Sequence, residues 1–323
     1  MTRIVFLDRA TIAPHIPVPQ PAGRIDWVQY DSTRPDQVAA RLQGAEVVIT
    51  NKVRITDAIL QACPQLRLVA IAATGFDGVD LAAAKARGVT VCNIRGYSVN
   101  TVPEHVMALL LALRRNLLPY ARDVEAGRWQ ESGQFCFFDH PIRDLAGGVM
   151  GIVGRGQIGR KVAKLAEAFG MQVCFAARPG QLEAQAQAAE DGRLPFDEML
   201  ARADVISLHC PLTEDTRGLL GATAFGKMAR KPVIVNTGRG GLIDLPALRD
   251  ALEAGQIAGA GIDVADQEPP PAEDVLMQLA KDPRVIVTPH VAWASDAAQT
   301  ALAQQLCQVI EGFLAGAPMN VLT

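Results

Sequence analysis

The stretch that decides the fold is Gly151-Ile152-Val153-Gly154-Arg155-Gly156-Gln157-Ile158-Gly159. It ends an apolar run and opens RKVAKLAEAFG, which has the spacing of an amphipathic helix. In such a strand-to-helix turn the first glycine permits the tight turn, the second lets the backbone approach a pyrophosphate, and the third allows close helix packing. The alternative interpretation is that these glycines serve only a tight strand-to-helix turn and bind no nucleotide. The alternation of strands and helices around the stretch disfavours that alternative. The predicted dinucleotide contacts are Gly154, Arg155, Gly156, Gln157, Ile158 and Gly159.

Short β-branched runs alternate with helical patterns on both sides of this stretch. RIVFLD, AEVVIT and LRLVAIAA precede it, and MQVCFAA, ADVISLHC, PVIVNTG, IAGAGIDV and RVIVTPH follow it. Strands that alternate with helices predict parallel sheets with helical crossovers. We predict an α/β protein with two doubly wound parallel-sheet domains. A Rossmann cofactor domain, residues 101–291, is inserted into a flavodoxin-like substrate domain, residues 1–100 and 292–323.

Composition narrows the class of partner. The chain has 323 residues, 49% of them hydrophobic, and a formal net charge of −3. No long run of Lys or Arg appears, so neither nucleic acid nor an anionic membrane surface is expected as a partner. The start MTRIVFLDRA becomes charged too early for a signal peptide, and no apolar run reaches the roughly 18 residues of a membrane span. Six cysteines without a C-x-x-C pair indicate reduced thiols and no metal site. We expect a cytoplasmic protein with a small-molecule partner.

Three stretches of the second series carry one ionisable residue each, just beyond a predicted strand. NTGRGGLID contains Arg239, GIDVADQEP contains Glu268, and TPHVAWAS contains His290. Ligands of open α/β sheets bind outside the carboxyl ends of the strands, so these side chains should converge there. Taken singly, each has an ordinary explanation: a surface or core histidine, a loop glutamate, or a turn arginine in a weak surface ion pair.

With T-G-F-D-G-V-D, N-T-x-x-R-G, x-E-P and T-P-H, the chain resembles the D-2-hydroxyacid dehydrogenases over essentially its full length, and most of all their glycerate dehydrogenase/hydroxypyruvate reductase branch. The resemblance implies NAD(P)H-dependent reduction of small 2-keto acids, such as hydroxypyruvate and glyoxylate, to D-2-hydroxy acids, and the reverse oxidation. It implies that Glu268 orients His290. A histidine has an ordinary pKa of about 6.5 and suits the proton donor, and a guanidinium suits carboxylate and carbonyl oxygens, the role expected of Arg239.

Further site residues follow from the resemblance. Thr74 and Gly75 are expected to bind the substrate carboxylate, with Lys52 either adding a charge or remaining an exposed lysine. Thr101, Thr237 and Asp263 are expected to contact the cofactor. His209 follows a strand where the family's loop runs along the nucleotide, and a core or loop role stays equally open. We expect the three other histidines, His15, His105 and His140, to be structural.

The nucleotide preference is predicted from VCFAARPG, residues 173–180. NAD-selective sites normally place Asp or Glu at the end of this strand, where Ala177 stands. Arg178 follows and is suited to a 2′-phosphate, with Arg155 assisting. The alternative is an exposed Arg178 and equal use of both nucleotides. We predict NADP as the preferred cofactor and NAD as the secondary one.

One segment predicts the assembly. GRWQESGQFCFFDHPIRDLAG carries Trp129, Phe135, Phe137 and Phe138, an aromatic density that is costly to expose. Relatives use this region as a dimerisation arm, so a homodimer is expected, with packing inside one subunit as the alternative. A different class of function also stays open, because some relatives on this scaffold are nucleotide-sensing binding proteins or corepressors.

Overall fold

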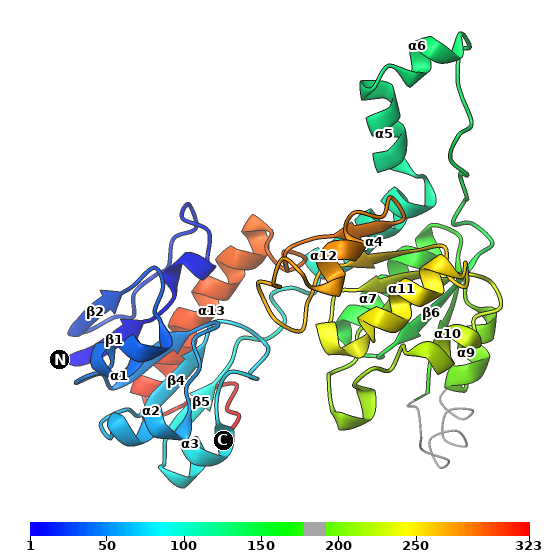
Figure 1. Ribbon diagram of the computed structural model, residues 1–323. Coiled ribbons are helices and arrows are strands. Elements are labelled where there is room, and N and C mark those ends of the chain that lie inside the picture. Colours follow the sequence, from blue (N-terminus) through cyan, green and yellow to red (C-terminus); the bar gives the residue numbers. More distant parts are fainter. Residues whose placement is uncertain (178–191) are drawn as a thin grey trace. The chain divides into compact units, whose positions relative to one another are not determined.

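The structure is a computed structural model that describes residues 1–177 and 192–323, and they form two compact units. The first unit comprises Met1–Ser98 and Ala294–Thr323, and the second comprises Val99–Trp293 (Figure 1). Each unit is built on its own parallel sheet with helices against it. The predicted α/β class with two parallel sheets is therefore confirmed.

The sheet of the first unit has the order β2-β1-β3-β4-β5, a doubly wound order of the flavodoxin type. Its strands are β1 (Thr2–Phe6), β2 (Ile25–Gln29), β3 (Val47–Thr50), β4 (Leu68–Ile71) and β5 (Thr90–Cys92). The helices α1 (Val38–Arg41), α2 (Asp57–Ala62) and α3 (Leu81–Ala86) contribute Val38, Leu60 and Ala84 to one core cluster with this sheet. The long helix α13 (Asp296–Leu314) begins where Ser295 accepts a hydrogen bond from Ala298 N, and it contacts β4.

The sheet of the second unit has the order β11-β10-β9-β8-β6-β7. Its strands are β6 (Val149–Val153), β7 (Gln172–Phe175), β8 (Val205–Leu208), β9 (Val233–Asn236), β10 (Gly259–Ile262) and β11 (Val285–Val287). Beyond β7, Leu194 forms an isolated parallel β-bridge with Ala176, so the backbone pairing continues past β7 at this edge of the sheet. The direction of the strand order reverses between β6 and β8, and ligands of such sheets bind at this point.

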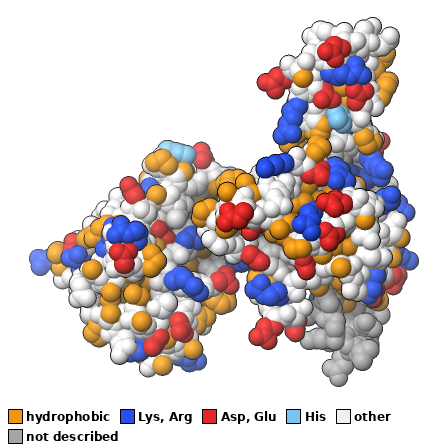
Figure 2. Space-filling model, in the orientation of Figure 1, with side chains coloured by type: hydrophobic (Ala, Val, Ile, Leu, Met, Phe, Trp, Pro, Cys, Tyr) orange, Lys and Arg blue, Asp and Glu red, His pale blue; other side chains and the backbone are white. Residues whose placement is uncertain are grey.

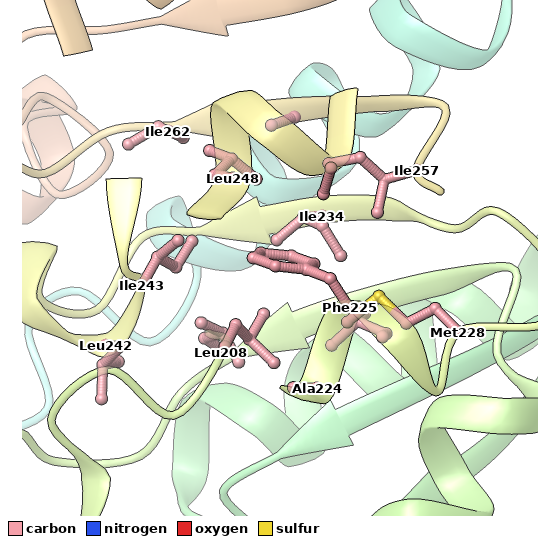
Figure 3. Packing of buried hydrophobic residues seen from close by; sticks show 14 of the residues in the cluster. Leu208, Ala224, Phe225, Met228, Ile234, Leu242, Ile243, Leu248, Ile257 and Ile262 are labelled. Carbon is pink, nitrogen blue, oxygen red and sulfur yellow. The ribbon is translucent and has the colours of Figure 1, made fainter. Parts of the chain in front are cut away.

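Both faces of this sheet are covered, because apolar side chains point alternately to either side. On one face, α4 (Thr101–Arg114) and α7 (Gln157–Ala168) pack on residues such as Val205 and Val235. On the other face, Ile206 and Ile234 join a cluster with α9 (Phe196–Arg202), α10 (Ala222–Gly226), α11 (Leu245–Glu253) and α12 (Val275–Leu279). The fully buried ring of Phe225 lies between Ile243 and Ile234 in this cluster (Figure 3).

Two helices of the second unit stand away from its sheet. They are α5 (Leu117–Glu125) and α6 (Arg128–Ser132), and they form an arm, residues 117–144, whose return segment leads to β6 (Figure 1). Trp129, Phe135 and Phe138 are exposed there, with 88% of Phe135 and 84% of Phe138 accessible. Phe137 instead packs within the chain, with its ring centroid 5.4 Å from that of Tyr120.

The surface matches the weak net charge of the sequence. On the face shown in Figure 2, basic and acidic side chains are interspersed. Within residues 1–177 and 192–323, no helix is long and apolar enough to cross a membrane.

Candidate active site

The glycine loop joins β6 to α7, at the carboxyl edge of the second unit's sheet. Gly154 has φ +106°, and a Cβ there would collide with the His209 carbonyl, so the loop can lie against the chain after β8 only with glycine at this position. A Cβ at Gly159 would collide with the Gly154 carbonyl, and therefore α7 packs closely on the turn. At Gly156, the N-cap of α7, a Cβ would meet nothing within 4 Å, so its side of the loop is open. This geometry fits a pyrophosphate at the start of a twelve-residue helix.

His209 lies beside this loop. Its N–H donates to Val153 O at 2.7 Å, and its Nε2 is 2.8 Å from Ser207 Oγ. The residue is half-buried, and burial lowers the pKa of His209 from 6.5 to about 4. At neutral pH the imidazole is uncharged, so it can offer a hydrogen bond but no positive charge to a nucleotide.

The end of β7 lacks a carboxylate. Ala176 and Ala177 occupy it and are buried, and Ala177 N donates to Leu194 O at 2.7 Å. The Arg155 guanidinium lies over the Phe175 ring, 5.4 Å from its centroid. A cation from the glycine loop is thus held at the end of β7. The predicted contact Arg178 lies outside the residues that the structure describes.

Arg239 follows β9 in a loop that Asn236 holds. The buried Asn236 side chain donates to Arg239 O at 2.8 Å and accepts from Gly238 N at 3.0 Å. At the next residue, Gly240, a Cβ would collide with the backbone of Ala265, so the loops after β9 and β10 touch. The hydroxyl of Thr237 is buried and has no hydrogen-bond partner among the described residues. A buried hydroxyl without a partner, at the same sheet edge as the glycine loop, fits a bound ligand that completes its hydrogen bonding.

Glu268 and His290 meet across the loops after β10 and β11. Glu268 Oε2 is 2.7 Å from His290 Nδ1, and Glu268 Oε1 accepts from Ala265 N at 3.1 Å. The two side chains are 30% and 28% exposed, so the pair is reachable and only partly solvated. A charged imidazole carries one proton on each ring nitrogen. Because the Glu268 carboxylate holds the Nδ1 side of the His290 ring, Nε2 is the nitrogen whose proton can be given to a substrate. The resulting unit is suited to hold and deliver one proton.

Asp263 holds the chain that follows β11. Its side chain is fully buried, and its carboxylate accepts from Val291 N and Ala292 N at 2.9 Å each. Thr101, predicted beside it, donates from Oγ1 to Ala292 O at 3.1 Å. In this structure both residues therefore secure the loop that carries His290, and a contact with a cofactor stays a prediction.

The predicted substrate residues lie on the carboxyl edge of the first unit's own sheet. Thr74, after β4, donates from Oγ1 to Ile94 O at 2.8 Å and accepts at its carbonyl from Asn93 Nδ2 at 2.8 Å; Gly75 follows it. Lys52 follows β3, and its backbone N–H donates to Asp8 at 2.7 Å. Sequence reasoning missed Asp8, whose signal is a carboxylate directly after the first strand.

Asp8 holds the turn that carries Lys52. Its buried carboxylate also accepts from Asn51 N at 3.0 Å and Val53 N at 3.2 Å. Burial raises the pKa of Asp8, while these backbone donors act in the opposite direction. In residues 1–177 and 192–323, no group of three His, Cys, Asp or Glu side chains could hold a metal ion.

Comparison with known proteins places this geometry in a family. Residues 107–292 match the model of the D-isomer specific 2-hydroxyacid dehydrogenase, NAD binding domain. The chain is 47% identical to the glycerate dehydrogenase of Methylorubrum extorquens, covering 99% of this chain and 98% of that one. It is 35% identical to the hydroxypyruvate reductase of Blautia hydrogenotrophica, covering 99% of both. Among solved structures, an acyclic imino acid reductase in complex with NADPH and D-Arg superposes with a TM-score of 0.81 at 27% identity, over the full length of both chains.

Proposed function

The chain belongs to the D-isomer specific 2-hydroxyacid dehydrogenase family, and from this premise we propose that it reduces hydroxypyruvate and glyoxylate to the corresponding 2-hydroxy acids with a nicotinamide cofactor. The observation that carries the proposal is the Glu268–His290 pair, joined at 2.7 Å at the same sheet edge as the glycine loop. A protonatable pair at the sheet edge that carries a dinucleotide turn suits the reduction of a carbonyl by a nicotinamide cofactor.

Each group then has one task. The glycine loop and the start of α7 would hold the nicotinamide dinucleotide, which would supply the hydride for the substrate's carbonyl carbon. His290 donates a proton from Nε2 to the carbonyl oxygen, and the Glu268 carboxylate stabilises the imidazolium until that transfer. In the oxidative direction neutral His290 accepts the proton. Arg239 binds the carboxylate and carbonyl oxygens through its planar guanidinium, and the Thr74–Gly75 turn binds the carboxylate.

NADP is the proposed preferred cofactor, with NAD as the secondary one. The support is the pair of buried alanines at the end of β7, which leaves no carboxylate to repel a 2′-phosphate, and the Arg155 guanidinium held over Phe175. Thr101, Thr237 and Asp263 remain proposed cofactor contacts, as does Arg178, which lies outside the described residues.

A homodimer built on the arm is the proposed assembly. Phe135 and Phe138 border an open hollow of about 460 Å³ that Arg128 and Phe137 also line. Two almost fully exposed phenylalanines beside a hollow favour a second copy as the occupant, because burying them removes apolar surface from water. A cytoplasmic location, predicted from the sequence, stays a prediction.

A substrate panel tests the proposal. Purified protein is mixed with NADPH or NADH and with hydroxypyruvate, glyoxylate or pyruvate, and loss of the reduced nicotinamide absorbance is followed. Turnover of hydroxypyruvate or glyoxylate supports the enzyme. Tight NADPH binding without turnover of any of the three would favour a nucleotide-sensing protein or corepressor instead.

A further inference from the structure

The loop that carries His290 is tied to Asp263 at successive positions. Asp263 O accepts from His290 N at 2.7 Å, Asp263 Oδ1 accepts from Val291 N at 2.9 Å, and Oδ2 accepts from Ala292 N at 2.9 Å. His290 itself has φ +54°, a left-handed conformation that a residue with a side chain adopts at a cost. Such a conformation persists only where the surroundings hold it firmly. The direction of the His290 ring therefore depends on how well this loop is secured.

His105, on the first turns of α4, completes this set of hydrogen bonds. Its Nε2 lies 3.0 Å from Thr288 Oγ1 and 3.6 Å from Asp263 Oδ1. Thr288 Oγ1 donates its one proton to Asp263 Oδ1 at 2.5 Å. Since that proton is committed, His105 Nε2 must be the donor in its contact with the Thr288 oxygen. The contact thus places a proton on His105 Nε2.

Helix α4 also holds the other end of the loop that carries His290. Thr101, one turn before His105 on the same face of α4, donates to Ala292 O at 3.1 Å. The loop is thus held at Thr288 and at Ala292, with His290 between the two points. α4 is also packed on β9, β10 and β11, so its position is set by the core.

We propose that His105 is a positioning residue: through Thr288 and Asp263 it holds the loop that aims His290 at the substrate. The inference rests on the proposed function for its effect on turnover. His105 is 22% exposed and bonds to Thr288, while Glu268 is the carboxylate that bonds to the His290 ring. His105 therefore acts on His290 through the loop and not through a proton relay.

The test replaces His105 in two ways. His105→Leu removes the donor at similar volume, whereas His105→Gln keeps an N–H at a comparable reach. We expect His105→Leu to lower kcat about tenfold, because small displacements of a reacting group are costly, with little change in the Kd for NADPH. His105→Gln should recover most of the loss. His15→Leu is the matched control, because His15 forms an exposed pair with Asp296 at 2.9 Å in the other unit.

Amide hydrogen exchange of residues 290–292 supplies a readout that needs no substrate. Exchange of these amides should accelerate about tenfold in His105→Leu and stay unchanged in His15→Leu. Thr288→Val removes the shared hydroxyl, so adding His105→Leu to it should cost little more, and full additivity would contradict the network. Unchanged exchange, or unchanged kcat in an active enzyme, would overturn the inference. If the wild type turns over none of the keto acids, the proposed function fails, and exchange alone decides whether His105 holds the loop.

Discussion

Titration of His209 tests whether the nucleotide loop carries a positive charge. Burial lowers the pKa of His209 from 6.5 to about 4, so the folded protein keeps the imidazole neutral where the unfolded chain protonates it. One pKa unit corresponds to about 1.4 kcal/mol, and the depression of the His209 pKa therefore amounts to at most about 3.5 kcal/mol. This contribution to stability is fully present above about pH 6.5 and is lost as the pH falls from there towards 4.

The chain has five histidines, so the ring signals of ¹³C-labelled protein can be followed one by one, and His209→Gln identifies the His209 signal by its absence. We expect that signal to stay unshifted down to about pH 5. In urea unfolding, the stability difference between wild type and His209→Gln should shrink below pH 6.5. NADPH affinity of the variant should keep the wild-type salt dependence. A titration midpoint near 6.5 would refute the reasoning, because it would mean that the ring is solvated.

The remaining predictions concern catalysis, cofactor choice and assembly. His290→Ala should lower kcat by about 100- to 10,000-fold with NADPH binding nearly intact, and near-normal turnover would reject His290 as proton donor. Glu268→Gln should lower kcat with NADPH binding nearly intact, because the His290 ring loses the carboxylate that orients it at 2.7 Å; an unchanged kcat would separate the two residues. Ala177→Asp should reverse a preference for NADPH, and Arg155→Ala should raise KM for NADPH more than for NADH, whereas a wild-type kcat/KM higher with NADH would contradict the proposal. Phe135→Asp with Phe138→Asp should convert a dimer into a monomer of 34.5 kDa by light scattering, and a wild-type monomer would exclude the arm as an interface.

Local patterns were enough for the strands and the glycine turn. The spacing of Gly154, Gly156 and Gly159 predicts a close-packed turn because the reason is local: a side chain at the first or third position would strike a neighbouring carbonyl. Parallel strands also place their carboxyl ends on one edge, so the sequence could predict that Glu268 and His290 follow strands on the same side. The structure adds the distance of 2.7 Å between them, while their roles stay predictions.

Neighbouring residues of one type show where sequence stops being sufficient. Phe137 and Phe138 are adjacent and chemically identical, yet Phe137 packs on Tyr120 while 84% of Phe138 is accessible. His105 carries no sequence signal beyond its spacing from Thr101, and it becomes a partner of Thr288 only because α4 packs beside β11. Asp263 is similar, since its burial under the His290 loop depends on chain more than twenty residues away.

The sequence by itself determined the fold class, the dinucleotide turn and the family, because these depend on periodicity and on short-range steric rules. Tertiary structure alone decided which ionisable groups are charged and which polar groups are bonded. His209 is neutral because burial disfavours its charged form, and the Asp8 carboxylate accepts hydrogen bonds from the turn around Lys52. Burial and hydrogen-bond partners come from segments distant in the chain, and they set the free energy of ionisation, which no local pattern of residues encodes.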